Sequence, residues 1–280
     1  MISVDNVSYR YSGTPKDVLT GVNLQIQDGE FVAIMGENGA GKTTLVKMFN
    51  GLIKPREGSV YVDGIDTREK SVAQLSRDVG LIFQNPDHQL FAETVAEELS
   101  FSLRNFGFDE QTIKRRVTNI STALDLEKYV DSSPFVLSGG ERKRLALAAI
   151  LVWDPKHIIM DEPTIGQDYL QKDRLRQFIV QLISQGKTII IVTHDIEFVA
   201  ECKPRIVLLS KGAVIADDSA PKILTNDETL AKASLVRPQI AELIHQLPIS
   251  EKPPDIIDAY AAREFLLTRL LKRNETKDLR

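Results

Sequence analysis

Eight residues near the N-terminus form a pattern that can hold a phosphate group. They follow a strand-like apolar run, 31–35, and precede a helical stretch, 44–50, and their order is Gly36-Glu37-Asn38-Gly39-Ala40-Gly41-Lys42-Thr43. Glycines let such a loop wrap around an anion with its backbone N–H groups pointing inward, and the following helix adds its positive end. Lys42 would supply a point charge to the terminal phosphates, and Thr43 a hydroxyl to Mg²⁺. A plain glycine-rich turn is the alternative, but the strand before the loop and the helix after it favour nucleotide binding.

Two adjacent carboxylates follow another apolar run further along the chain. Residues 157–160 are typical of a buried strand, and Asp161 and Glu162 come directly after it. Ligands of parallel sheets gather at the carboxyl ends of the strands, so Asp161 is placed to hold Mg²⁺ and Glu162 to polarise water for attack on a γ-phosphate. Such a pair alone could be solvated surface, yet neighbouring carboxylates are costly unless a cation or solvent compensates them. Together with the loop, the pair predicts hydrolysis of a nucleoside triphosphate.

Two further side chains are expected at the same edge of the sheet. His194 follows the apolar run 188–193, and its imidazole could contact the γ-phosphate and sense its presence. Gln84 follows the run 79–83, and its amide oxygen could bind Mg²⁺ or water. A histidine after a strand is usually structural, and Gln84 alone would be interpreted as a turn residue. Each becomes a candidate only in combination with the loop and the acidic pair.

A second anion cradle is predicted in a different part of the chain. Ser138, Gly139 and Gly140 form a turn that opens a helical stretch from about Glu141, and such a turn offers backbone N–H groups to an anion. The surrounding region, 86–153, carries apolar residues at helical spacing and lacks strand signals. One active site does not need two cradles, so the second one requires another explanation.

The elements that must position these residues alternate between strands and helices. Five short apolar runs without a polar face predict strands covered on both sides: 31–35, 79–83, 157–160, 188–192 and 205–209. Three earlier runs alternate more strictly, near turn pairs, and predict antiparallel additions: 4–10, 22–27 and 59–62. A short strand-like run, 213–215, closes the core. The expected fold class is α/β, with an antiparallel β subdomain, an inserted helical subdomain over about 86–153, and a C-terminal helical extension.

The C-terminal part of the chain differs in composition from the rest. Four prolines separate its helical pieces: Pro238, Pro248, Pro253 and Pro254. The last piece is predicted to run from about Asp255 to Lys272, with apolar residues along one side: Ile257, Ala261, Phe265 and Leu266. The expected division is a first domain over 1–220 and an extension over 221–280. The extension could cap its own domain or contact a partner in a dimer, and the sequence favours neither.

Composition and charge exclude several classes of protein. The 280 residues contain 35 Lys and Arg against 39 Asp and Glu, and the net charge of −4 argues against a nucleic-acid binder that relies on a basic surplus. The hydrophobic fraction of 42% excludes disordered and fibrous chains. Cys202 is the single cysteine, so no disulfide forms within the chain, and a reducing cytoplasm is expected. The longest apolar stretch, 145–153, is far shorter than the roughly 18 residues of a membrane span.

Taken together, the motifs resemble those of the nucleotide-binding subunits of ABC transporters. The resemblance covers nearly the first 220 residues, and the matching segments in chain order are GENGAGKTT (36–44), Gln84, LSGGE (137–141), IIMDEPT (158–164) and His194. It implies a P-loop NTPase core that binds and hydrolyses ATP with Mg²⁺. In this family two subunits sandwich two ATP molecules, and the phosphate loop of one faces the LSGG turn of the other. The second cradle would therefore complete the site of a partner.

The resemblance also implies roles for individual residues. Glu162 and His194 would be catalytic, and the metal ligands would be Thr43, Gln84 and Asp161. ATP would be bound by the loop with Thr44, by Gln84, and by Tyr11, whose ring would stack on adenine; Tyr9 is the alternative. Four residues would contact ATP in the partner's site: Ser138, Gly139, Gly140 and Glu141. Asp168 occupies the acidic position of the family's D-loop.

A narrower resemblance lies in the segment after Gln84. The run Phe83–Phe91, with Pro86, Asp87 and Gln89, looks like the ATPases of energy-coupling factor (ECF) transporters, which import vitamins and cobalt or nickel ions. There these three residues would lie near a transmembrane coupling subunit. The resemblance implies a homodimer, or a heterodimer with a related ATPase, on the cytoplasmic face of the cell membrane. A membrane substrate-binding subunit completes the implied complex, and nucleic acid is not among the implied partners.

The implied mechanism is a clamp. ATP held at Lys42 recruits the opposite LSGG turn and closes the pair, and hydrolysis assisted by Glu162 lets the pair open. Closure would pull on the segment after Gln84 and pass the motion to a membrane partner. Two other functions stay open: the ATPase of a conventional ABC importer or exporter, and a soluble ABC ATPase that acts on ribosomes or DNA. The single phosphate loop and the negative net charge argue against the soluble protein.

Overall fold

The computed structural model describes residues 1–248, 253 and 255–275, with side chains up to residue 269. Parts of the predicted C-terminal extension, namely 249–252, Pro254 and 276–280, lie outside the described residues. The main sheet has six strands in the order β10-β9-β3-β8-β7-β6, and only β10 runs antiparallel to its neighbour. Its strands are β3 (Phe31–Met35), β6 (Val79–Ile82), β7 (His157–Asp161), β8 (Thr188–Val192), β9 (Arg205–Ser210) and β10 (Ala213–Ser219).

The central strands of the main sheet are buried on both faces. Along β3, Val32 and Ile34 point into one apolar cluster, whereas Ala33 and Met35 point into another. Successive side chains of a strand alternate between the two faces of its sheet, so a run without polar residues must be covered on both sides. The prediction of doubly covered strands is confirmed, and the α/β fold class with it.

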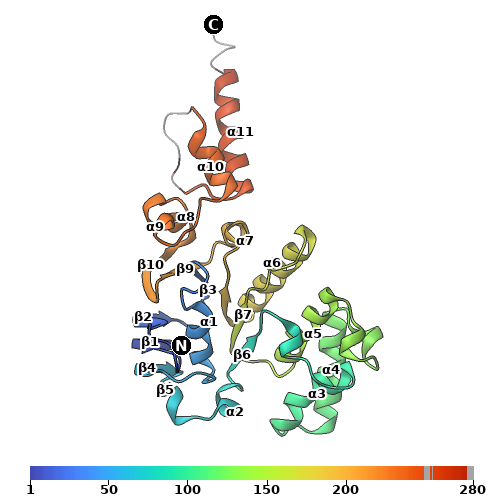
Figure 1. The fold of residues 1–280 in the computed structure, drawn as a ribbon. Coiled ribbons are helices and arrows are strands. Elements are labelled where there is room, and N and C mark those ends of the chain that lie inside the picture. The colour runs from blue at the N-terminus through green and yellow to red at the C-terminus, as the bar shows by residue number, and fades with distance from the viewer. Residues whose placement is uncertain (249–252, 254, 276–280) are drawn as a thin grey trace.

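A second, antiparallel sheet covers one face of the first. Its strand order is β2-β1-β4-β5, with the bounds β1 (Ile2–Tyr9), β2 (Leu19–Ile26), β4 (Glu57–Val62) and β5 (Ile65–Asp66). Helix α1 (Lys42–Phe49) lies between the two sheets in Figure 1 and contributes Leu45, Val46, Met48 and Phe49 to their shared core. The predicted antiparallel additions are therefore confirmed.

Helices cover the other face of the main sheet. They are α6 (Tyr169–Ser184), α7 (Ile196–Cys202), α8 (Ala220–Leu224) and α9 (Asp227–Lys232). Side chains such as Ile179, Phe198 and Leu224 pack with Met35 and Ile191 of the sheet. The sequence analysis did not predict α6 or α7 as helices.

A separate helical part lies to one side of the main sheet in Figure 1. Its helices are α3 (Val95–Asn105), α4 (Glu110–Ala123) and α5 (Gly139–Leu151), and short helical turns accompany it: η2 (Pro86–His88), η3 (Glu127–Tyr129) and η4 (Pro134–Val136). Leu99, Leu126 and Leu145 belong to its own apolar cluster. Two further short helices follow the antiparallel sheet: η1 (Thr67–Glu69) and α2 (Val72–Leu75).

The C-terminal elements depart from the prediction in two places. Strand β10 extends to Ser219, beyond the predicted 215, because it pairs with β9 as far as Ser219 opposite Arg205. Helix α11 spans Ala259–Glu275 and packs on α10 (Gln239–Gln246). The predicted start at Asp255 is wrong, because Asp258 caps the helix and its Oδ1 accepts from the N–H groups of residues 260 and 261 at 3.1 Å. Within the described part of the chain, no helix has both the length and the apolar character to cross a membrane.

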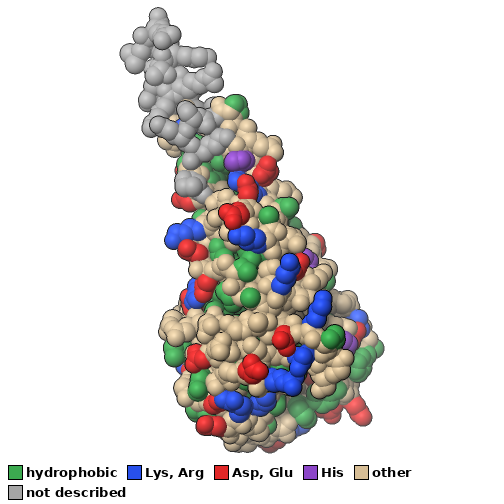
Figure 2. All heavy atoms as spheres, turned by 60° about the vertical axis from the view of Figure 1, so that its left-hand side comes forward, with side chains coloured by type: hydrophobic (Ala, Val, Ile, Leu, Met, Phe, Trp, Pro, Cys, Tyr) green, Lys and Arg blue, Asp and Glu red, His purple; other side chains and the backbone are tan. Residues whose placement is uncertain are grey.

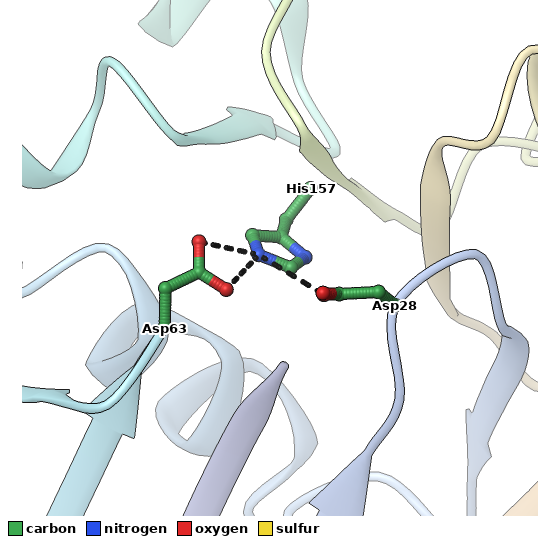
Figure 3. Close-up of side chains that lie close together, drawn as sticks. All are labelled: Asp28, Asp63 and His157. Carbon is green, nitrogen blue, oxygen red and sulfur yellow. Dashed lines mark hydrogen bonds and ion pairs between the residues drawn. The ribbon is translucent and has the colours of Figure 1, made fainter.

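A group of polar side chains joins the two sheets at the amino end of β7, and we call Asp28, Asp63, Lys156 and His157 the tie cluster. Figure 3 shows three of its members, Asp28, Asp63 and His157. Lys156 Nζ lies 2.9 Å from an Asp28 oxygen and 2.7 Å from an Asp63 oxygen. His157 is fully buried, and its Nε2 lies 3.4 Å from both carboxylate oxygens of Asp63. The amino group of Met1 contacts Asp63 at 2.6 Å. The carboxylates of the tie cluster are therefore matched by cations of the chain itself.

Candidate functional site

The phosphate loop depends on glycine at two tightly packed positions. Gly36 has φ +143°, and a Cβ there would lie 2.0 Å from the carbonyl oxygen of Leu209. Gly41 has φ +100°, and its Cβ would lie 2.7 Å from the carbonyl oxygen of Val18. Gly41 is also the N-cap of α1 and provides no side-chain cap. The first backbone N–H groups of α1 therefore remain available to an anion.

Lys42 is folded back onto its own loop. Its side chain is almost fully buried, and Nζ donates to the carbonyl oxygens of Gly36 at 2.8 Å and Glu37 at 3.0 Å. Burial lowers the pKa of Lys42, while the carboxylates of Glu162 and Asp161 oppose that shift. The ammonium group is thus held by neutral carbonyls, which a phosphate can replace as its partner.

Asp161 connects the acidic pair to the phosphate loop. The Thr43 hydroxyl donates to Asp161 Oδ2 at 2.9 Å. The other oxygen, Oδ1, is buried and has no hydrogen-bond partner among the described residues, and burial raises the pKa of this carboxyl. Mg²⁺ prefers carboxylate, hydroxyl and water oxygens. The pair of a hydroxyl and a carboxylate with an unused buried oxygen fits that preference.

Glu162 sits in a strained backbone conformation at the end of β7. Its φ is +50°, which is unusual for a residue with a side chain, and its N–H donates to Val192 O at 2.7 Å. Oε1 lies 2.8 Å from His194 Nδ1, whereas Oε2 is buried without a partner in the described structure. The His194 side chain is 54% exposed, so its ring reaches the surface. We call Lys42, Thr43, Asp161, Glu162 and His194 the carboxyl-edge cluster.

Gln84 reaches the same edge of the sheet. It is exposed and lines a cavity of about 360 Å³ together with Asp161, Glu162 and, on the helical part, Gly140. The cavity therefore runs from the carboxyl edge of the sheet toward α5. The predicted group of Gln84, Asp161, Glu162 and His194 is brought together by the fold.

Tyr11 is the more accessible of the two candidate aromatic residues. Its hydroxyl lies 3.1 Å from Thr44 Oγ1 in the first turn of α1, and the side chain is 39% exposed. Tyr9 packs against the core and meets the Tyr11 ring edge to face at 5.0 Å. Of the two rings, that of Tyr11 has the free surface that stacking on a base requires.

The second cradle begins α5, in the helical part of the molecule (Figure 1). Ser138 Oγ accepts from the N–H of Glu141, and Glu141 Oε2 accepts from the N–H of Ser138 at 2.8 Å, which forms a capping box. The Tyr129 hydroxyl donates to Glu141 Oε1. Hydrogen bonds from Tyr129 and then Ser138 lower the pKa of Glu141 to about 2. The turn is thus fixed by Glu141, which stays ionised at neutral pH.

The remaining predicted residues have defined local partners. Asp168 caps α6 by accepting from the N–H of residue 171 at 2.8 Å. Asp87 is exposed and forms an ion pair with Arg142 of α5 at 3.3 Å, while Pro86 starts η2. Gln89 is half-buried. Its amide oxygen accepts from Phe83 N at 3.3 Å, and its amide NH₂ donates to the carbonyl oxygen of residue 146 at 2.7 Å. The Gln89 side chain therefore holds this segment to the molecule itself.

Sequence reasoning missed several residues that support the site. Asp195 caps α7 through Phe198 N at 3.1 Å and pairs with Lys172 at 2.5 Å, directly after His194. Its position before a short apolar run is a helix-start signal that could have revealed it. Buried Glu98 accepts from the N–H groups of residues 91 and 92 at 2.9 Å, and no local pattern indicates this.

Comparisons with known proteins agree with this arrangement. A family model described as ABC transporter matches residues 19–165. The energy-coupling factor transporter ATP-binding protein EcfA2 of Clostridium perfringens is 37% identical and aligns with 98% of this chain and 99% of that protein. The structure of cbiO1 from Clostridium perfringens, described as part of the ABC transporter complex cbiONQ, has a TM-score of 0.73 at 34% identity and covers 87% of this chain and 98% of its own.

A further solved structure bears on the chemistry. The ATP-binding cassette MJ0796, solved as a dimer in a post-hydrolysis state bound to ADP and Pi, has a TM-score of 0.71 at 31% identity and covers 79% of this chain and 99% of its own. The resemblance predicted from the motifs is therefore confirmed, including the likeness to ECF ATPases. The chain belongs to the ABC transporter family, as an ATP-binding subunit that hydrolyses ATP.

Proposed function

We propose that this chain is the ATPase of an ECF-type importer and that the carboxyl-edge cluster is its hydrolytic site. The observation that carries the proposal is the bond between Thr43 and Asp161, which joins the phosphate loop to the acidic pair across 118 positions of sequence. The alignment with EcfA2 over 98% of this chain supports the ECF type, because it includes the C-terminal extension. The cargo would be a vitamin or a transition-metal ion.

Each residue of the cluster has a distinct task in this proposal. Lys42 exchanges its carbonyl partners for the terminal phosphates, which suits an ammonium group that burial has already desolvated. Thr43, Asp161 and Gln84 would hold Mg²⁺, which when bound neutralises phosphate charge. Glu162 would orient the attacking water and accept its proton, and Oε2, which has no hydrogen-bond partner among the described residues, is the free acceptor. His194 holds Glu162 by the 2.8 Å contact and reaches toward the γ-phosphate.

The site is proposed to be shared between two copies or two related chains. Ser138, Gly139 and Gly140 begin α5 in the helical part (Figure 1), whereas the phosphate loop joins the end of β3 to the start of α1. A helix start with open N–H groups attracts anions, so the turn would complete a site on the neighbouring ATPase. Asp168 and the C-terminal extension would add contacts between the two copies.

The proposed membrane partners follow from the ECF type. Exposed Asp87, which pairs with Arg142 of α5, and half-buried Pro86 beside it would face a transmembrane coupling subunit. On the face shown in Figure 2, basic and acidic side chains are interspersed, which does not favour a nucleic-acid partner. The chain would act on the cytoplasmic face of the membrane, with a separate membrane subunit that binds the cargo.

Turnover at different protein concentrations tests the shared site. We expect specific activity to fall on dilution to a proven single-copy state, and Ser138→Ala to lose at least about tenfold in turnover because a donor to the phosphates is removed. Ser133→Ala is the matched control, because Ser133 also caps a helical turn. Activity that is independent of concentration, or a Ser138→Ala protein with normal turnover, contradicts the shared site.

Copurification tests the transport assignment. The full chain, tagged and isolated from membranes in mild detergent, should retain a membrane scaffold and a separate cargo-binding membrane protein. Recovery of a pair of transmembrane subunits without a separate cargo-binding membrane protein would indicate a conventional importer or exporter. Recovery with ribosomes would indicate the soluble class instead.

A further inference from the structure

The C-terminal elements touch the phosphate loop directly. Ser234, just after α9, donates through Oγ to Glu37 Oε2 at 3.2 Å. Glu37 is the second residue of the loop, and its carbonyl oxygen accepts from Lys42 Nζ at 3.0 Å. The end of α9 is itself fixed to the main sheet, because Ser210 Oγ donates to Lys232 O at 2.8 Å. The segment that leads into α10 therefore rests against the residue that holds the loop's lysine.

A second connection passes through α7, which begins two residues after His194. In its first turn, Glu197 Oε1 accepts from the N–H of Gln239, the first residue of α10, at 2.8 Å. At its end, Lys203 pairs with Asp258 Oδ2 at 2.7 Å, and Asp258 is the cap of α11. Both helices of the extension are thus bound to the element that follows His194.

Apolar packing makes these connections stiff. Ala241 of α10 and Ile257 before α11 belong to the same buried cluster as Phe198 and Val199 of α7. Packed side chains move together, because close-packed interiors do not deform continuously. A displacement of α7 or of the α9–α10 connection would therefore displace α10 and α11 by a similar amount.

We propose that α10 and α11 respond to the nucleotide, and that three polar ties, Ser234 to Glu37, Glu197 to Gln239 and Lys203 to Asp258, carry the response. A triphosphate would bring negative charge beside the Glu37 carboxylate and beside His194. It would therefore act on Glu37, where the connection through Ser234 begins, and on His194, which precedes α7. By thermodynamic reciprocity, an extension that senses the nucleotide also changes the affinity for it. This inference rests on the proposed nucleotide site.

Hydrogen–deuterium exchange on the full chain tests the proposal. The probe is adenylyl imidodiphosphate with Mg²⁺, used below the concentration at which sedimentation detects pairing, so that contacts between copies do not protect α10 and α11. We expect the analogue to change exchange in α10 and α11 of the unmodified chain. In the triple variant Ser234→Ala, Glu197→Ala, Lys203→Ala, that change should disappear, and the affinity for the analogue should shift by at least about fivefold.

A matched variant controls for the loss of surface polar groups. Ser184→Ala, Glu228→Ala and Lys222→Ala remove a similar exposed hydroxyl, carboxylate and ammonium whose partners lie within four residues. This control should keep the response, and unchanged exchange in β3 and β8 verifies that each variant is folded. The proposal is overturned if the analogue binds without changing exchange in α10 and α11, or if the change survives in the triple variant. Failure of the unmodified chain to bind the analogue would instead overturn the proposed function, and this inference with it.

Discussion

The two ends of β7 carry similar residues with opposite consequences. The carboxyl-edge cluster and the tie cluster each contain two carboxylates, a histidine and a lysine. In the tie cluster the lysine pairs with both carboxylates. In the carboxyl-edge cluster the lysine binds carbonyl oxygens, and two carboxylate oxygens are left buried without partners among the described residues.

The pKa directions express the same difference. Burial raises the pKa of Asp161. Burial also acts to raise the pKa of Asp63, but hydrogen bonds from Lys156 and from the amino group of Met1 outweigh it and leave that pKa well below its usual value. Residue types alone therefore do not separate a structural cluster from a binding site. What separates them is whether the chain supplies the compensating charge or leaves it to a ligand.

The largest expected effect comes from removing the free acceptor at the carboxyl edge. Glu162→Gln keeps the size of the side chain but cannot accept a proton, so turnover should fall by about 10²–10⁴-fold. Phosphate release measures turnover, and equilibrium binding of a fluorescent ATP analogue should stay close to that of the unmodified protein. Normal turnover in the purified variant would refute the role assigned to Glu162.

The tie cluster should respond in stability instead of activity. Asp63→Asn removes the charge that Lys156 and His157 face, and the free energy of unfolding should fall by about 1–2 kcal/mol. Turnover per folded molecule should change by less than about twofold. Asp218→Asn, which weakens an exposed pair with Lys222, is the control for denaturant unfolding. A large loss of turnover in Asp63→Asn would erase the distinction between the two clusters.

The opposite change in stability is expected for Asp161→Asn. Because burial raises the pKa of Asp161, the charged form is unfavourable in the folded chain at neutral pH. The neutral amide should therefore raise the free energy of unfolding of the nucleotide-free protein by about 1 kcal/mol, although turnover is lost. Thermal unfolding with and without Mg²⁺ and ATP measures both effects. A lower Tm in the absence of ligand would contradict the prediction.

The smallest effect should be a pH dependence that arises in the tie cluster. Burial lowers the pKa of His157, so the folded state favours neutral imidazole. Its contribution is complete above the unfolded pKa of about 6.5 and declines as the pH falls below it, because only the unfolded chain then binds the proton easily. Between pH 7 and pH 5.5 the Tm should fall by no more than about 3 °C, and His157→Gln should reduce that slope. An equal slope in both proteins would place the titration elsewhere.

Local patterns predicted the features that depend on short stretches of chain. The glycines of the phosphate loop form a short sequence motif with Lys42 and Thr43, and the acidic pair stands at the end of its own strand. The common edge of parallel strands was enough to bring Gln84 and His194 into the same group. No geometry from distant segments was needed for these predictions.

Features that depend on competition between distant partners were not predictable. Both Asp255 and Asp258 could start the last helix, and the structure uses Asp258, whose second oxygen lies 2.7 Å from Lys203. The contact of Tyr129 with Glu141 and that of Ser234 with Glu37 have no local signal, because each joins residues from separate elements. Gln89 shows the same limit, since its inward hydrogen bonds depend on where α5 packs.

The capping box at the start of α5 also bears on how two copies would meet. Glu141 is held from both sides by Ser138 and Tyr129, so the first turn is wound before any ligand arrives. Ordering a loose turn at the moment of association would weaken binding by about 1–2 kcal/mol for each residue fixed. In this protein the turn is already ordered by folding, so association would not carry this entropy cost. The first turn of α5, which is proposed to contact a neighbouring ATPase, is therefore preformed in the isolated molecule.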